Sequence, residues 1–148
     1  MLRTLFFEHP DDPTSWLVED EYMFGSSLLV APLFEETTSR RVYLPPGTWI
    51  DYQTGRAYEG GRWHEMTAGP IPIVLLVKNQ TVLPHLAVAE STSAMNWKDV
   101  QLRIFSTDGG MAEGSFALPG GGVQSLRVEG TRLVSDPLGG RVKWRITQ

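Results

Sequence analysis

The sequence predicts an all-β fold with a β-sandwich followed by a smaller β unit, and three observations predict it. Fifteen glycines and ten prolines punctuate the 148 residues. The apolar runs between them have the length of strands, and several alternate apolar with polar residues. Hydrophobic residues make up 41% of the chain, which is enough for a packed core.

The first 36 residues predict a strand, a short helix and a second strand. Residues 4–8 form a short apolar run that ends before Pro10. Residues 19–24 are expected to make one or two helical turns that end at Gly25, a common helix terminator. Residues 28–34 are continuously apolar, which is typical of a strand covered on both faces, as in a parallel sheet.

Residues 37–90 predict the β-sandwich, because short strands alternate with tight turns. The turns are rich in proline and glycine, as in Pro45-Pro46-Gly47. The expected strands cover residues 41–44, 48–52, 56–58, 62–67, 71–77 and 81–83. Trp49 is expected in the core of this sandwich.

Residues 91–148 predict the smaller β unit, which a polar stretch at residues 90–96 separates from the sandwich. Glycine-rich turns at residues 120–122 and 138–140 separate apolar runs that alternate with polar residues. The expected strands cover residues 100–106, 114–118, 123–128, 132–135 and 141–147.

Composition and motifs exclude several functions. The net charge of −4 gives no electrostatic reason to bind nucleic acid or an anionic membrane. The chain has no cysteine, which excludes disulfides, thiol nucleophiles and cysteine-based zinc sites. No run approaches the roughly 20 apolar residues of a membrane span, and no signal-peptide pattern follows Met1, so we expect a cytoplasmic location. No phosphate-binding loop is present, and we expect no cofactor.

Three ordered strings near the start of the chain are LFFEHPDD (residues 5–12), EYMFG (residues 21–25) and LLVAP (residues 28–32). They resemble the last strands of the catalytic (β/α)8 barrel in glycoside hydrolase family 31, which includes α-glucosidases and α-xylosidases. Residues 42–51 and 71–84 are similar to its proximal carboxy-terminal β-sandwich, with residues 71–77 and 82–84 as the strand pair that closes it. The resemblance implies a barrel remnant at residues 1–36, a proximal β-sandwich at 37–90 and a distal β domain at 91–148.

The resemblance also implies a supporting role. A retaining glycosidase needs two carboxylates about 5–5.5 Å apart, and in the family these acids lie on earlier barrel strands. We therefore assign no catalytic residue. We expect a non-catalytic carboxy-terminal region that supports the catalytic barrel of an α-glucosidase or α-xylosidase and is inactive alone. Without that barrel, we expect residues 1–36 either to drive self-association into a homo-oligomer or to refold onto the sandwich.

Two other functions stay open. A carbohydrate-binding module would present aromatic side chains to an oligosaccharide, and Trp63 is a candidate for that role. In an intact enzyme, His9 at the end of a barrel-like strand is a second candidate substrate-binding residue, because active sites are built at that end of a barrel. A small stand-alone α-glycosidase would need acids such as Glu8, Asp11 or Asp12, although the acidic residues between positions 8 and 21 are expected to be solvated. The three histidines lack metal-ligand spacing, so we expect no metal site.

Overall fold

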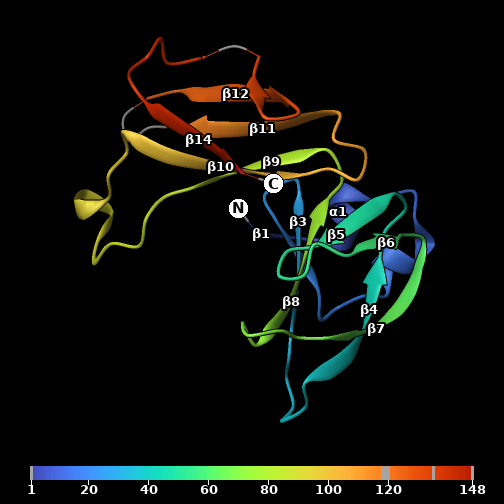
Figure 1. The fold of residues 1–148 in the computed structure, drawn as a ribbon. Coiled ribbons are helices and arrows are strands. Elements are labelled where there is room, and N and C mark those ends of the chain that lie inside the picture. Colours follow the sequence, from blue (N-terminus) through green and yellow to red (C-terminus); the bar gives the residue numbers. More distant parts are fainter. Residues whose placement is uncertain (1, 118–120, 135, 148) are drawn as a thin grey trace. The chain divides into compact units, whose positions relative to one another are not determined.

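The computed structural model describes residues 2–117, 121–134 and 136–147, and its fold is all-β. The chain divides into two compact units, Met1–Asn79 and Gln80–Gln148. Each unit is built from its own strands, which Figure 1 shows as a ribbon. Each unit also has its own hydrophobic core. The sequence divided the chain into residues 1–36, 37–90 and 91–148, each matched to one part of a glycoside hydrolase. That division stays a prediction.

The first unit combines a six-stranded sheet with a two-stranded sheet. The order in the larger sheet is β1-β2-β3-β8-β5-β6, and β4 pairs with β7. The described pairings in both sheets are antiparallel. The elements are β1 (Leu2–Thr4), α1 (Leu5–Glu8), the 3-10 helix η1 (Pro13–Trp16), β2 (Tyr22–Phe24), β3 (Leu28–Pro32), β4 (Ser39–Leu44), β5 (Thr48–Asp51), β6 (Ala57–Glu59), β7 (Arg62–Thr67) and β8 (Ile73–Lys78).

The front of the chain keeps the predicted order of strand, short helix and strand, but the boundaries were wrong. Residues 5–8 are helical rather than extended, and the helix expected at residues 19–24 is replaced by strand β2. Met23 is buried while Phe24 is exposed, which is the alternation of a strand. Gly25 has φ +69° and turns β2 into β3 instead of ending a helix. Strand β3 is buried as predicted, but it pairs antiparallel with β2 and β8.

The core of the first unit combines buried residues of both sheets, and Trp49 is its largest fully buried side chain. Its side chain is fully buried, as predicted, and its indole Nε1 donates to the carbonyl of Pro45 at 2.8 Å. Gly60 also approaches this turn, and a Cβ there would lie 1.9 Å from the Pro45 oxygen. Leu5 of α1 and Val18 of the loop after η1 belong to this core. The buried core residues from the two sheets are Met23, Leu29, Ala31, Val42, Tyr43, Leu44, Trp49, Met66, Val74 and Leu76.

The second unit is one six-stranded sheet in the order β13-β12-β11-β9-β10-β14. Strand β14 runs parallel to β10, and β9 pairs antiparallel with β10 (Figure 1). A short 3-10 helix, η2 (Thr92–Ala94), lies within the predicted linker. The strands are β9 (Thr81–His85), β10 (Asp99–Phe105), β11 (Met111–Ala117), β12 (Val123–Glu129), β13 (Arg132–Leu133) and β14 (Lys143–Thr147).

Strand β9 belongs to the second unit, whereas the sequence had placed it beside residues 71–77 in the first sandwich. Gln80, with φ +61°, separates β8 from β9, so the two strands enter different sheets. Val82 is buried in the core of the second unit. Residues 118, 120 and 135, which belong to predicted strands and a turn, lie outside the described residues. No helix among the residues placed by the structure has the length and apolar character needed to cross a membrane.

Candidate functional site

Two open hollows on the first unit contain the residues that the sequence singled out. Each has a volume of about 430 Å³. The hollow that contains Trp63, here called the tryptophan hollow, is lined by Asp20, Pro32, Leu33, Phe34, Glu35, Thr37, Ser39, Arg40, Arg41 and Trp63. The other, the histidine hollow, is lined by Glu8, His9, Pro10, Asp11, Asp12, Pro13 and Pro46. His9 and Trp63 therefore do not share one hollow, and their substrate-binding roles stay predictions.

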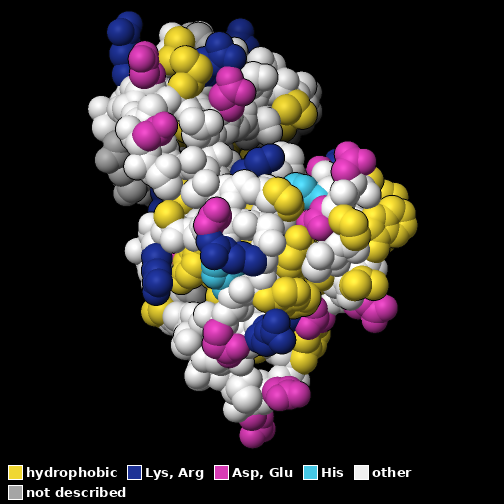
Figure 2. Space-filling view, turned by 90° about the vertical axis from the view of Figure 1, so that its right-hand side faces the viewer, with side chains coloured by type: hydrophobic (Ala, Val, Ile, Leu, Met, Phe, Trp, Pro, Cys, Tyr) yellow, Lys and Arg dark blue, Asp and Glu magenta, His cyan; other side chains and the backbone are white. Residues whose placement is uncertain are grey.

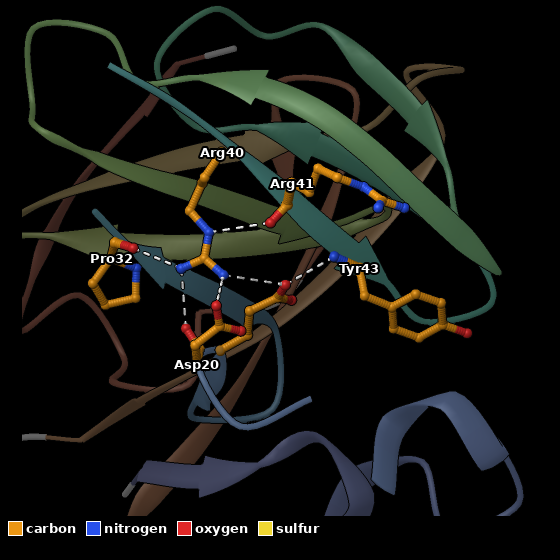
Figure 3. Close-up of polar contacts among 6 residues, drawn as sticks. Asp20, Pro32, Arg40, Arg41 and Tyr43 are labelled. Atoms are coloured by element: carbon orange, nitrogen blue, oxygen red, sulfur yellow. Dashed lines mark hydrogen bonds and ion pairs between the residues drawn. The ribbon is translucent and has the colours of Figure 1, made fainter. Parts of the chain in front are cut away.

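Arg40 fixes the wall of the tryptophan hollow (Figure 3). Its Nη1 donates to the carbonyl of Pro32 at 2.6 Å and to the carbonyl of Asp20 at 3.2 Å. Its Nη2 forms an ion pair with the Asp20 carboxylate, and its Nε donates to the carbonyl of Arg41 at 3.2 Å. The guanidinium therefore ties the start of β4 to the end of β3 and to the loop before β2. The contacts of the Arg40 guanidinium with Asp20, Pro32 and Arg41 are here called the Arg40 clamp.

Glu21 is a buried acid beside this clamp. Its side chain is inaccessible to solvent, and its Oε1 accepts a hydrogen bond from the Tyr43 amide at 2.8 Å. Its Oε2 is buried and has no hydrogen-bond partner among the described residues. Burial raises the pKa of Glu21 to about 7, although the Tyr43 amide and the Arg40 charge act in the opposite direction. A substantial fraction of Glu21 is therefore protonated at neutral pH.

Trp63 lies on a supported aromatic surface. The β4–β7 register places it directly opposite Tyr43, with the ring centroids 5.4 Å apart. The Arg41 guanidinium lies 5.3 Å from the Trp63 ring centroid, and the indole side chain remains 40% exposed. Tyr43 is itself buried, and its hydroxyl donates to Asp12 Oδ2 at 2.7 Å. This bond holds the ring behind Trp63 in a fixed position.

Asp12 in the histidine hollow caps η1. Its carboxylate accepts hydrogen bonds from the Thr14 amide and the Ser15 hydroxyl, both at 3.1 Å. Burial alone would raise the pKa of Asp12, but the hydrogen bonds from Tyr43, Thr14 and Ser15 together hold it below its ordinary value. Asp12 therefore stays ionised and is poorly suited to act as a general acid.

Two neighbours of Asp12 in the histidine hollow, His9 and Glu8, are also unsuited to acid catalysis. Burial, followed by the charge of Lys78, lowers the pKa of His9, so its imidazole is neutral at pH 7. Glu8 forms an ion pair with Arg3. Within the described part of the chain, no three histidine, aspartate or glutamate side chains are placed to hold a metal ion.

Sequence reasoning missed Arg40 and Glu21. Glu21 had been grouped with solvated acids, and this was wrong because the residue is buried. The usable signal was the period of two, which places residue 21 on the same side as the buried Met23 once residues 22–24 are taken as a strand. Arg40 carries no comparable local signal, because its partners come from distant parts of the sequence.

The fold and the hollows define a two-unit β-domain protein, and neither unit is a closed barrel in the part that the structure describes. The model of the glycosyl hydrolase family 31 C-terminal domain matches residues 1–83, and the chain belongs to this family. The resemblance drawn from the sequence strings is therefore confirmed.

Curated relatives include α-glucosidases and α-xylosidases. Alpha-glucosidase 2 of Bacillus thermoamyloliquefaciens is 35% identical over 113 residues, which cover 76% of this chain and 14% of the relative. An α-xylosidase of Emericella nidulans is 34% identical over 94 residues, covering 57% of this chain and 12% of the relative. The matched region is thus a small part of these longer proteins.

Solved structures of longer enzymes contain a region that is similar in fold to this chain. The cycloalternan-forming enzyme from Listeria monocytogenes, in complex with its pentasaccharide substrate, matches with a TM-score of 0.73 and 26% identity, over 87% of this chain and 13% of that one. A family 31 α-xylosidase from Xanthomonas citri matches with a TM-score of 0.68 and 31% identity, over 77% of this chain and 12% of that one.

Proposed function

We propose that this chain acts as a non-catalytic carboxy-terminal β region of an α-glycoside hydrolase of the α-glucosidase or α-xylosidase type. Its task is to support the catalytic barrel. The observation that carries this proposal is a set of exposed apolar side chains on the first elements of the first unit. The relatives named above supply the class of substrate.

These side chains form the N-terminal apolar surface, defined as Leu2, Phe7, Trp16, Leu17 and Phe24, with exposed fractions between 54% and 79%. Leu2 and Phe24 are direct partners in the β1–β2 pairing. The Phe6 ring connects Trp16 with Phe7, since its centroid lies 4.9 Å from the Trp16 ring and 4.4 Å from the Phe7 ring. Figure 2 shows hydrophobic side chains gathered on one side of the first unit, with acidic side chains among them.

The N-terminal apolar surface is suited to a partner rather than to water. Large exposed apolar patches mark interaction surfaces, and burying one stabilises the complex in proportion to the area removed from water. Strand β1 is also the edge of its sheet, so its outer backbone groups are open to a neighbouring element. The occupant we propose is the catalytic barrel, because the matched segment makes up 14% of the α-glucosidase relative and the remainder can supply the contact.

The environments of Glu8, Asp12 and Glu21 favour a supporting role over catalysis. A retaining glycosidase needs one protonated acid and one carboxylate facing a shared substrate. In the histidine hollow, Asp12 has a lowered pKa and Glu8 is paired with Arg3. The acid with the raised pKa, Glu21, is buried and does not line either hollow described above.

A chimera tests the supporting role. The matching segment of alpha-glucosidase 2 is replaced by this chain, and the melting temperature and α-glucosidase activity of the chimera are measured. The double variant Phe7→Ser/Trp16→Ser is expected to lower both, because it removes apolar area from the proposed contact. Val123→Ser, at an exposed position of the second unit, is the matched control and should change neither.

The same substitutions in the isolated chain separate docking from folding. Since Phe7 and Trp16 are largely exposed, the melting temperature of the isolated chain should hardly change. Equal effects of the double variant on the chimera and on the isolated chain, or no effect on the chimera, would overturn the proposed contact.

A further inference from the structure

The tryptophan hollow is not used by the supporting role, and it combines apolar faces with polar groups of both signs. Trp63 and Phe34 expose 40% and 72% of their surface. Asp20 and Glu35 contribute carboxylates, and Arg41 contributes a guanidinium. Its volume of about 430 Å³ falls within the range of small-ligand sites, roughly 300–1,000 Å³.

The aromatic wall of this hollow is held in place before any ligand arrives. Trp63 packs against Tyr43, which two hydrogen bonds fix: the Tyr43 hydroxyl donates to Asp12 and the Tyr43 amide donates to Glu21. A surface that is already ordered loses little conformational entropy when a ligand binds, and affinity benefits accordingly.

The polar wall is held in place by Arg40. Its guanidinium bonds the Pro32 carbonyl and both the carbonyl and the carboxylate of Asp20, so the two ends of this wall cannot drift apart. The Arg40 guanidinium carbon also lies 5.9 Å from the Phe34 ring centroid. By contrast, Arg41 is exposed, so its guanidinium can move aside from the Trp63 ring or donate to a ligand beside it.

We propose that the tryptophan hollow is an accessory binding site for a neutral oligosaccharide. A sugar ring has an apolar CH face that stacks on an aromatic side chain, and its hydroxyl groups both donate and accept hydrogen bonds. Carboxylates and a guanidinium in one hollow match such a ligand. The opposite charges disfavour a strongly anionic or cationic ligand, since one set would repel it. This site is independent of the N-terminal apolar surface.

Calorimetric titration of the full chain with maltotriose and with xylotriose tests the proposal. At least one of the two sugars should bind, and Trp63→Ala should weaken that binding about tenfold or more. Trp16→Ala is the matched control, because Trp16 is another exposed tryptophan and does not line the hollow. Trp63→Phe should recover part of the affinity, and Arg41→Met should weaken binding by a smaller factor.

Several results would overturn the site. The first is that the parent chain binds neither sugar at millimolar concentration. The second is that a folded Trp63→Ala variant binds the sugar as tightly as the parent chain does. The third is that inorganic phosphate, and not sugar, binds in a manner that depends on Trp63. Circular dichroism and the melting temperature of Trp63→Ala establish that it is folded. Sugar binding that survives Phe7→Ser/Trp16→Ser, together with an unaffected chimera, would support this site while contradicting the proposed barrel contact.

Discussion

Arg40 reaches across the first unit to a buried carboxylate, with its Nη2 3.7 Å from Glu21 Oε1. The same guanidinium also pairs with Asp20 at the more exposed end of the clamp. One cation therefore serves two neighbouring acids, of which one is buried and carries a raised pKa. This relationship links the stability of the first unit to pH and to the shape of the tryptophan hollow.

Glu21→Gln should flatten the dependence of stability on pH. The pKa of Glu21 is about 7 in the folded chain and 4.5 ordinarily, so its protonated form stabilises the fold fully below pH 4.5. This contribution is lost as the pH rises through about 7, and the lost free energy of unfolding is on the order of 3 kcal/mol. Glutamine stays neutral and keeps the acceptor for the Tyr43 amide. Urea unfolding at several values between about pH 5 and pH 8 measures the effect.

The comparison with the parent chain isolates Glu21. His9 and His64 have lowered pKa values, chiefly because of burial, so their contribution to stability rises with pH over the same range. Both proteins share that contribution, and the difference between them removes it. An unchanged pH slope in the glutamine variant would show that Glu21 does not titrate in this range.

Arg40→Met should destabilise the first unit by about 2–4 kcal/mol. The substitution leaves the buried Glu21 carboxylate without its cation and removes the donor to the Pro32 carbonyl. Arg41→Met is the matched control, because the neighbouring guanidinium is exposed, and its effect should stay within about 0.5 kcal/mol. Similar losses in the two variants by urea unfolding would contradict a specific role for Arg40.

Gly114→Ala should destabilise the second unit by about 2 kcal/mol or more. A Cβ at Gly114 would lie 2.1 Å from the Val82 carbonyl oxygen, so β9 and β11 would have to separate. Gly122→Ala provides the control, because the nearest atom to its Cβ is the flexible Gln124 amide nitrogen at 3.9 Å. Thermal unfolding of both variants measures the difference, and an equal melting temperature would refute the close approach.

The isolated chain should self-associate through the N-terminal apolar surface. Without a partner on that surface, copies of the chain remove apolar area from water by covering one another. Sedimentation velocity should show a concentration-dependent oligomer that Phe7→Ser/Trp16→Ser disperses. Val88→Ser, at a fully exposed position of the second unit, should leave it intact. Oligomers that persist in the double variant would locate self-association elsewhere.

Local patterns in the sequence were sufficient for much of the fold. The turn at Pro45-Pro46-Gly47 and the core position of Trp49 followed from turn chemistry and from the strand pattern, and both occur in the structure. Strand β9 was recognised as a strand but assigned to the wrong sheet. Its partner β10 lies across the η2 linker, and a local pattern does not specify such a distant pairing.

The candidate sites were harder to predict for the same reason. Trp63 could be chosen because an aromatic residue in a polar strand stands out. The Arg40 clamp and the burial of Glu21 could not be predicted, because the sequence at residues 19–21 has the acidic character of a solvated loop. Its burial depends on Arg40 and the Tyr43 amide, which only the folded chain brings together.

A purely supporting role requires that this chain alone does not hydrolyse α-glycosides, and a hydrolysis assay tests that requirement directly. Purified chain is incubated with 4-nitrophenyl α-glucoside and with 4-nitrophenyl α-xyloside, and nitrophenol release is followed over hours. The predicted result is a rate equal to that of buffer for both substrates. Turnover that disappears in Glu8→Gln, Asp11→Asn or Asp12→Asn would contradict the account, because it would place working catalytic acids within these 148 residues.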